Sequence, residues 1–231
     1  MTRGELIRMV REDWLDDVSD NPDQNDEDRR WSDQFIARWL ARGEIVACQG
    51  SRGGDLIFDS STAAVTQITL ATDTASYSSS SKITRIEAVI YDGAPLEQKT
   101  EREIVSENGD DWRTATGEPT AYIVKGRTIR FYPIPTSSEN GDTVYLEVYR
   151  IPIDSFKEEP EIPEEFHEYL CAYAAYRAYS RRDEDTHDPK RAAEALAEFE
   201  RIFGRPVSAS VRRHHLEQPR NTTFQTPGYC T

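Results

Sequence analysis

The sequence predicts an α+β protein: N- and C-terminal helices form a small bundle, an antiparallel β-domain is inserted between them, and an extended C-terminal arm follows. Apolar residues recur at helical spacing near both ends of the chain. Between about residues 55 and 150 they alternate with polar residues instead, and Ser, Thr, Val, Ile and Tyr become frequent. We therefore divide the chain into a helical pair (1–54), a β-domain (55–153), a second helical pair (154–204) and an arm (205–231).

The composition excludes several classes of protein. The 231 residues carry a formal charge of −14, which disfavours a free nucleic-acid-binding protein. No apolar run approaches the roughly 20 residues that cross a bilayer, and no signal-peptide stretch follows Met1, so we expect no membrane contact and synthesis in the cytoplasm. Cys48, Cys171 and Cys230 are too widely spaced for a disulfide framework or a Cys-x-x-Cys zinc site.

The first helical pair is marked by two N-terminal caps. Thr2 and Glu5 form a capping box that predicts a helix of about fifteen residues. Ser32 is the expected cap of a second helix, which should end near Gly50. Ten acids fall between residues 12 and 33, and we interpret this stretch as a solvated acidic loop.

The β-domain is predicted from strand-like runs and the turns between them. Hairpin-type turns are expected at Asp92-Gly93, Lys125-Gly126 and Asn140-Gly141. In the last strand, Val144, Leu146 and Val148 share one face, which should be buried. A second capping box, Thr100 with Glu103, predicts a short helix within this domain.

The second helical pair follows Pro160 and Pro163. Its first helix, residues 164 to about 180, carries apolar and aromatic residues around more than half of its circumference, which predicts two packing partners. We assign Phe166, Leu170 and Tyr173 to the bundle core and expect a neighbouring subunit to cover Tyr169, Tyr176 and Tyr179. Asp188, Pro189 and Gly204 should cap, start and end the final helix.

No pattern in the sequence predicts an enzyme, a metal site or a cofactor. His167 and Cys171 share a helix face and could form a base and nucleophile, but buried Cys and His are common packing residues in an aromatic helix. Residues 50–54 are glycine-rich, but they follow a helix, precede a strand and lack a lysine. We interpret them as a flexible joint rather than a phosphate loop.

The arm, residues 205–231, differs in charge from the rest of the chain. It shows no periodicity and holds four Arg against one acid, whereas the remaining residues carry a charge of −17. Arg212-Arg213 and the following His214-His215 could touch nucleic acid. The charge of the whole chain favours an acidic protein partner instead.

Four groups of short motifs follow one another along the chain: Trp31-Ser32-Asp33, Trp112 followed by Gly117-Glu118-Pro119 and Tyr122, Phe131-Tyr132-Pro133-Ile134-Pro135, and Ile162-Pro163 before Phe166-His167. In this order they resemble the head-to-tail adaptor (connector) proteins of tailed bacteriophages that have a β-domain inserted between two helical pairs. The likeness covers roughly residues 2 to 203. Each motif is short, and the resemblance rests on the order of the motifs along the chain.

The resemblance implies a structural virion protein at the head–tail interface, assembled in the host cytoplasm. Such adaptors form a ring, usually a dodecamer, that binds the portal protein and a tail or further connector protein and lets DNA pass without chemistry. A virion or cell-surface module that binds a ligand or glycan remains the alternative.

For such an adaptor, the charge pattern of the chain suggests roles for two groups of residues. Arg205, Arg212 and Arg213 would pair with portal carboxylates, with Phe224 and Tyr229 as aromatic anchors. We hypothesise that the acidic loop lines or rims the DNA conduit and repels phosphates, although it could serve solubility alone. The residues that would do so are Asp20, Asp23, Asp26 and Asp28.

Overall fold

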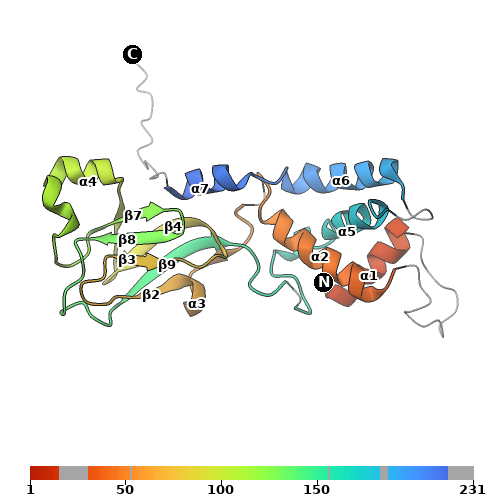
Figure 1. Cartoon of the computed structure of the whole chain (residues 1–231). Coiled ribbons are helices and arrows are strands. Elements are labelled where there is room, and N and C mark those ends of the chain that lie inside the picture. The colour runs from red at the N-terminus through yellow and green to blue at the C-terminus, as the bar shows by residue number, and fades with distance from the viewer. Residues whose placement is uncertain (16–30, 53, 156, 183–186, 218–231) are drawn as a thin grey trace, which may run out of the picture. The chain divides into compact units, whose positions relative to one another are not determined.

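A computed structural model of the chain describes residues 1–15, 31–52, 54–155, 157–182 and 187–217 (Figure 1). The chain divides into two compact units. The first comprises Met1–Asp59 and Tyr149–Ser208 and is built mainly of helices. The second comprises Ser60–Val148 and Ala209–Thr231, of which helix α7 (Ala209–Glu217) is described, and it contains most of the strands. The α+β prediction is confirmed.

The N-terminal helices begin at the predicted caps. Helix α1 (Arg3–Met9) has both hydrogen bonds of the capping box between Thr2 and Glu5, and it continues as a π-helix over Val10–Leu15. Helix α2 (Asp33–Ala47) follows Ser32, whose hydroxyl accepts a hydrogen bond from the backbone N–H of Phe35. Both caps stabilise a helix end because they satisfy a backbone donor that has no partner within the helix.

The second helical pair begins later than the sequence predicts. A 3-10 helix covers Glu164–Phe166, and helix α5 (Leu170–Tyr179) starts only after it. The ring of His167 contacts the carbonyl of Ile162 at 2.8 Å and holds the chain in this tighter turn. Helix α6 (Pro189–Phe203) confirms its predicted ends, with Asp188 as the N-cap and Gly204, at φ +74°, as the C-cap.

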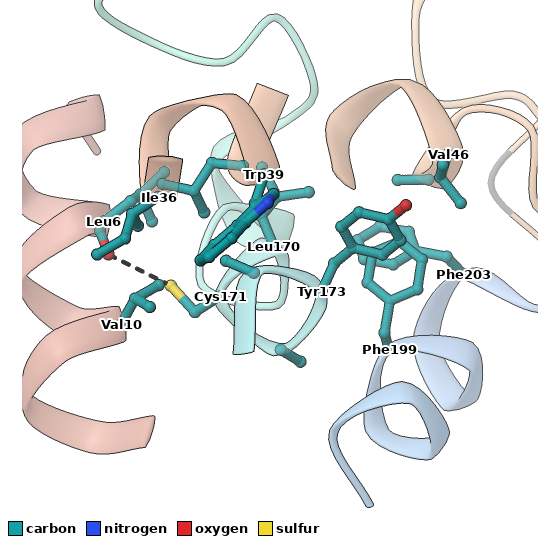
Figure 2. Packing of buried hydrophobic residues seen from close by; sticks show 14 of the residues in the cluster. Leu6, Val10, Ile36, Trp39, Val46, Leu170, Cys171, Tyr173, Phe199 and Phe203 are labelled. Carbon is teal, nitrogen blue, oxygen red and sulfur yellow. Dashed lines mark hydrogen bonds between the residues drawn. The ribbon is translucent and has the colours of Figure 1, made fainter. Parts of the chain in front are cut away.

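The core of the first unit joins α1, α2, α5 and α6 (Figure 2). Leu6 of α1, Val10 of the following π-helix and Ile36 of α2 lie beside Leu170 and Cys171 of α5. On the other side of α5, aromatic rings of α5 and α6 stack: the centroids of Tyr173 and Phe199 are 5.1 Å apart, and those of Phe199 and Phe203 are 4.7 Å apart. Offset aromatic pairs of this kind add to the free energy of apolar burial.

The ends of α2 and α6 meet where only glycine fits. A Cβ atom at Gly50 would lie 2.1 Å from the carbonyl oxygen of Phe203, and one at Gly204 would lie 2.2 Å from Oγ of Ser51. The backbone N–H groups of Ser51 and Arg52 donate to the carbonyls of Arg205 and Phe203, each at 3.0 Å. In the described residues 50–52 of the predicted flexible joint, the structure therefore has a fixed crossing of two backbones. Gly53 lies outside the described residues.

A buried ionic network lies where the chain leaves and re-enters the first unit. Arg150 contacts both Asp59 and Glu161 at 2.5 Å. Glu44 accepts a hydrogen bond from the backbone N–H of Glu161 at 2.5 Å and lies 3.7 Å from Arg3. None of these five side chains is more than 10% exposed. Buried charges are tolerated here because each has an opposite charge or a backbone donor beside it.

The chain forms two sheets, and most of their strands lie in the second unit. The first is ordered β1-β9-β4-β5, with β2 also paired to β9, and the second is ordered β3-β8-β7-β6. The strands are β1 (Phe58–Asp59), β2 (Gln67–Thr69), β3 (Ser76–Ser78), β4 (Ile83–Tyr91), β5 (Ala94–Pro95), β6 (Glu97–Gln98), β7 (Ala121–Lys125), β8 (Thr128–Tyr132) and β9 (Thr143–Arg150). The pairing of β6 with β7 is parallel. Short helices α3 (Ala63–Thr66) and α4 (Glu101–Asn108) and a 3-10 helix, Asp110–Arg113, complete the unit.

Two of the three predicted hairpins are confirmed. Asp92-Gly93 joins antiparallel β4 and β5, and Lys125-Gly126 lies at the turn between antiparallel β7 and β8. The third prediction is wrong, because β8 and β9 belong to different sheets. After β8 the chain crosses over: the N–H of Ile134 donates to the carbonyl of Ala115, and the N–H of Gly141 donates to the carbonyl of Leu70.

The inner face of the β-domain follows the predicted alternation. Val144, Leu146 and Val148 of β9 are at most 1% exposed, whereas Tyr145 is 47% exposed. They pack with Phe131 and other apolar residues in one cluster. The capping box of Thr100 and Glu103 is present at the start of α4.

The segment expected as an extended arm contains a helix. Helix α7 packs on β4 and β7, with Leu216 against the core of the β-domain. The backbone N–H of Gly126 donates to Oε1 of Glu217 at 2.8 Å, and Nε2 of Gln98 donates to the carbonyl of Leu216 at 3.1 Å. A nine-residue helix with so few apolar positions gives no periodic signal in the sequence.

Candidate assembly surface

Helix α5 approaches its neighbours closely because small side chains fill its buried positions. Ala172, Ala174, Ala175 and Ala178 are at most 1% exposed. On the facing helix α2, a Cβ atom at Gly43 would lie 3.1 Å from two carbons of Tyr173. Tyr173 of α5 is therefore buried against Gly43, whereas Tyr176 and Tyr179 of the same helix are half-buried.

The three tyrosines predicted for a subunit interface are all half-buried in the subunit. Tyr169 and Tyr176 pack against the edge of the helical core. The hydroxyl of Tyr179 donates to the carbonyl of Trp14, and the guanidinium of Arg191 lies 5.6 Å from the centroid of its ring. Tyr179 therefore stabilises the packing of its own chain, while all three tyrosines retain an exposed part.

Tyr176 lines a basic groove between α2 and α5, which we call the arginine groove. The groove encloses about 780 Å³. Its lining consists of Phe35, Arg38, Trp39 and Arg42 from α2, and Tyr176, Arg177, Ser180 and Arg181 from α5 and the residues just after it. Each helix thus contributes two arginines at i and i+4, a spacing that puts them on one face.

Aromatic rings form part of the wall of the arginine groove. The guanidinium of Arg181 lies 5.1 Å from the ring centroid of Phe35 and 5.6 Å from that of Trp31. The guanidinium of Arg38 lies 5.7 Å from the Phe35 ring. These cation–π contacts stabilise the arginine side chains at the surface. Sequence reasoning missed the groove because nothing in the sequence indicates that α2 and α5 lie side by side.

Tyr179 lines a second, smaller recess of about 440 Å³. Its other lining residues are Glu12, Asp13, Trp14, Arg191 and Glu194. The exposed tyrosine edges of α5 thus border two recesses of different charge, one basic and one mainly acidic.

His167 and Cys171 have separate structural partners and do not form a dyad. Sγ of Cys171 donates to the carbonyl of Leu6 at 3.7 Å (Figure 2), and burial raises the pKa of this thiol to about 12. Nε2 of His167 lies 2.8 Å from the carbonyl of Ile162, and Nδ1 lies 3.3 Å from the N-terminal amine of Met1. A thiol with such a high pKa is protonated at neutral pH and is not an activated nucleophile.

Among the residues that the structure describes, no three His, Cys, Asp or Glu side chains gather in a way that could hold a metal ion. In the same part of the chain, no helix is both long and apolar enough to cross a membrane.

The predicted portal-binding residues fall into three settings. Arg205 is exposed and pairs with Glu200 at 3.1 Å, beyond the end of α6. Arg212 is half-buried and Arg213 exposed on α7. Phe224 and Tyr229 lie outside the described residues.

The predicted acidic rim also lies outside the described part of the chain. Asp20, Asp23, Asp26 and Asp28 all fall between Leu15 and Trp31, the described residues on either side. Their assignment therefore rests on the sequence alone.

Comparison with known proteins identifies the family. No protein with a curated description matches the chain. The family described as SU10 adaptor protein matches residues 1–223, which include both helical pairs, the β-domain and α7. This match agrees with the resemblance to phage head-to-tail adaptors that the order of short sequence motifs indicated. The chain therefore belongs to the SU10 adaptor protein family.

Proposed function

We propose that this phage adaptor assembles into a ring between the portal and the tail, or a further connector, and that DNA passes through the ring. The observation that carries the proposal is the family match over residues 1–223. The resemblance described above implies a dodecamer at the head–tail interface of the virion, formed in the host cytoplasm. The proposed role is structural and requires no chemistry by the protein.

The proposed subunit interface includes the exposed edge of α5. Tyr169, Tyr176 and Tyr179 are half-buried, and their remaining surface is amphipathic, which suits a wet contact between subunits. A contact between two different faces of identical subunits closes into a ring when the rotation per subunit divides a full turn.

The proposed portal contact uses the basic C-terminal region. Arg205, Arg212 and Arg213 would pair with portal carboxylates, with Phe224 and Tyr229 as anchors. The charge of residues 205–231, four Arg against one acid, supports this assignment. Because α7 packs on the β-domain, the residues beyond Glu217 would reach the portal from that domain.

Mass photometry of the purified protein, with and without portal, tests the proposed function. We expect rings that cap the portal, and electron microscopy of the same mixture would show their stoichiometry. The double variant Tyr169→Ala/Tyr176→Ala should keep its thermal unfolding transition and lose ring formation. The matched control is Tyr145→Ala, at an exposed position of β9. Portal that stays uncapped by the unmodified protein would refute the proposal.

A further inference from the structure

The arginine groove presents four guanidinium groups that lack acidic partners within the described part of the chain. Arg38, Arg42, Arg177 and Arg181 are all exposed. The ion pairs found among the described residues involve other arginines and lysines. Four like charges around one groove repel each other, and an anionic occupant would relieve that repulsion.

The size and lining of the groove favour a short polypeptide segment. A volume of about 780 Å³ lies in the range of pockets that hold a small ligand or a few side chains. The arginines come from both walls, so they converge on an occupant that enters between α2 and α5. A DNA duplex presents its phosphates on a convex surface that cannot enter such a groove. A segment rich in carboxylates matches both the shape and the charge.

The chain itself contains a segment of this chemistry. Residues 16–28, which we call the acidic segment, hold seven acids in thirteen positions and no Lys or Arg. We propose that the acidic segment of one subunit binds in the arginine groove of the next subunit. This inference rests on the proposed ring and names one contact within it.

Electrostatics favours a second copy as the source of the segment. Subunits that each carry a charge of −14 repel one another, so assembly requires a local contact of opposite charge. A head-to-tail ring also requires two different complementary surfaces on every subunit. A basic groove and an acidic segment on the same chain meet both requirements.

Charge reversal on both walls of the groove tests the contact. The double variant Arg42→Glu/Arg177→Glu avoids the two arginines that lie on aromatic rings. We expect it to raise the protein concentration needed for half-maximal capping of portal by about tenfold or more. The control Arg102→Glu/Arg127→Glu makes the same change of charge at exposed positions of the β-domain and should have little effect. Adding Asp20→Arg/Asp23→Arg to the groove variant should restore capping.

Cross-linking distinguishes a contact between copies from one within a chain. All proteins carry Cys230→Ser, and the remaining Cys48 and Cys171 are buried. Arg42→Cys protein is mixed on portal with a mass-tagged Asp23→Cys protein and treated with a bis-maleimide. We expect a cross-linked pair of one tagged and one untagged chain. Intramolecular cross-linking of the double variant Arg42→Cys/Asp23→Cys, without the intermolecular product, would overturn the proposal.

Two outcomes separate this inference from the proposed function. If the unmodified protein caps portal and the groove variant does so equally well, the ring stands and the groove contact is refuted. If the groove variant assembles normally but particles eject DNA at a changed rate, the groove serves nucleic acid and the inference is overturned. A third outcome would also contradict the groove contact: rings that persist unchanged when Asn replaces Asp20, Asp23, Asp26 and Asp28. The conduit-rim hypothesis for these residues would then stay open.

Discussion

Nε of Arg150 lies 2.5 Å from Oδ2 of Asp59, and these two residues flank the points where the chain passes between its compact units. Asp59 is the last residue before the chain enters the second unit, and Arg150 follows the return of the chain at Tyr149. The backbone N–H of Arg150 also donates to the carbonyl of Ile57. The two segments that connect the units are therefore joined, at their ends in the helical unit, by an ion pair and by a backbone hydrogen bond.

Removing one member of this buried pair should lower the free energy of unfolding. Asp59→Ala leaves the guanidinium of Arg150 with one carboxylate in place of two, and we expect a loss of about 3 kcal/mol in the free energy of unfolding. The exposed pair of Arg8 and Glu12 provides the control, because Glu12→Ala should cost less than about 1 kcal/mol. Urea unfolding of both variants measures the difference. Equal losses of unfolding free energy in the two variants would show that the buried Asp59 pair contributes no more to stability than the exposed pair.

Glu44 should make the stability of the helical unit depend on pH. Burial raises the pKa of Glu44 from 4.5 to about 7, although hydrogen bonds and Arg3 act in the opposite direction. The folded state therefore holds this proton more tightly than the unfolded chain does. Stability from this group is complete below about pH 4.5 and is lost as the pH rises through 7, by up to about 3 kcal/mol.

Comparison with Glu44→Gln isolates this contribution. Relative to the unmodified protein, the variant should gain stability as the pH rises from 4.5 to 8, because glutamine does not ionise. The exposed Glu165→Gln is the matched control for the removal of one carboxylate from this unit. Thermal melts at intervals of half a pH unit provide the measurement. A constant difference between Glu44→Gln and the unmodified protein across this range would contradict the assignment.

Two glycines should respond in opposite directions to the same substitution. Gly50→Ala places a Cβ atom against the carbonyl of Phe203, so the crossing of α2 and α6 must open. We expect a loss of several kcal/mol or failure to fold. Gly4→Ala meets nothing within 4 Å in helix α1 and should raise stability by up to about 1 kcal/mol. A Gly50→Ala protein that melts at or above the temperature of the unmodified protein would show that the crossing is looser than described.

Local patterns predicted the helix ends and two of the turns. The capping boxes of Thr2 with Glu5 and of Thr100 with Glu103 each need only four consecutive residues, and both are present. The hairpin turns at Asp92-Gly93 and Lys125-Gly126 likewise depend on adjacent residues. Alternation along β9 correctly predicted its buried face, because side chains of a strand point to opposite faces in turn.

Features set by distant residues could not be predicted in this way. Asn140-Gly141 resembles a hairpin turn, but the chain before it pairs with Ala115 and leaves the sheet of β8. The arginine groove depends on the approach of α2 to α5, which the spacing of residues within either helix does not reveal. The same holds for Arg3, Glu44 and Arg150, whose contacts with Lys157, Glu161 and Asp59 join segments separated by more than 90 residues along the chain.

The docking of α7 on the β-domain should depend on Leu216. This side chain packs against the apolar cluster of the sheets. The hydrogen bonds at Gly126 and Gln98 contribute less to the free energy of docking, because water can bond to the same groups when α7 is released. Leu216→Asp should therefore release α7, and we expect its backbone amides to exchange with solvent at least about tenfold faster. Hydrogen exchange measured by mass spectrometry reports this change peptide by peptide.

Val211→Asp is the matched control on the same helix, because Val211 is 42% exposed. It should leave the exchange of α7 nearly unchanged. If the basic C-terminal region acts from the β-domain, Leu216→Asp should also weaken capture of portal, since Arg212 and Arg213 would lose their fixed position on α7. Equal exchange in both variants would mean that α7 is held by its polar contacts, and the portal contact would then not depend on the apolar docking of this helix.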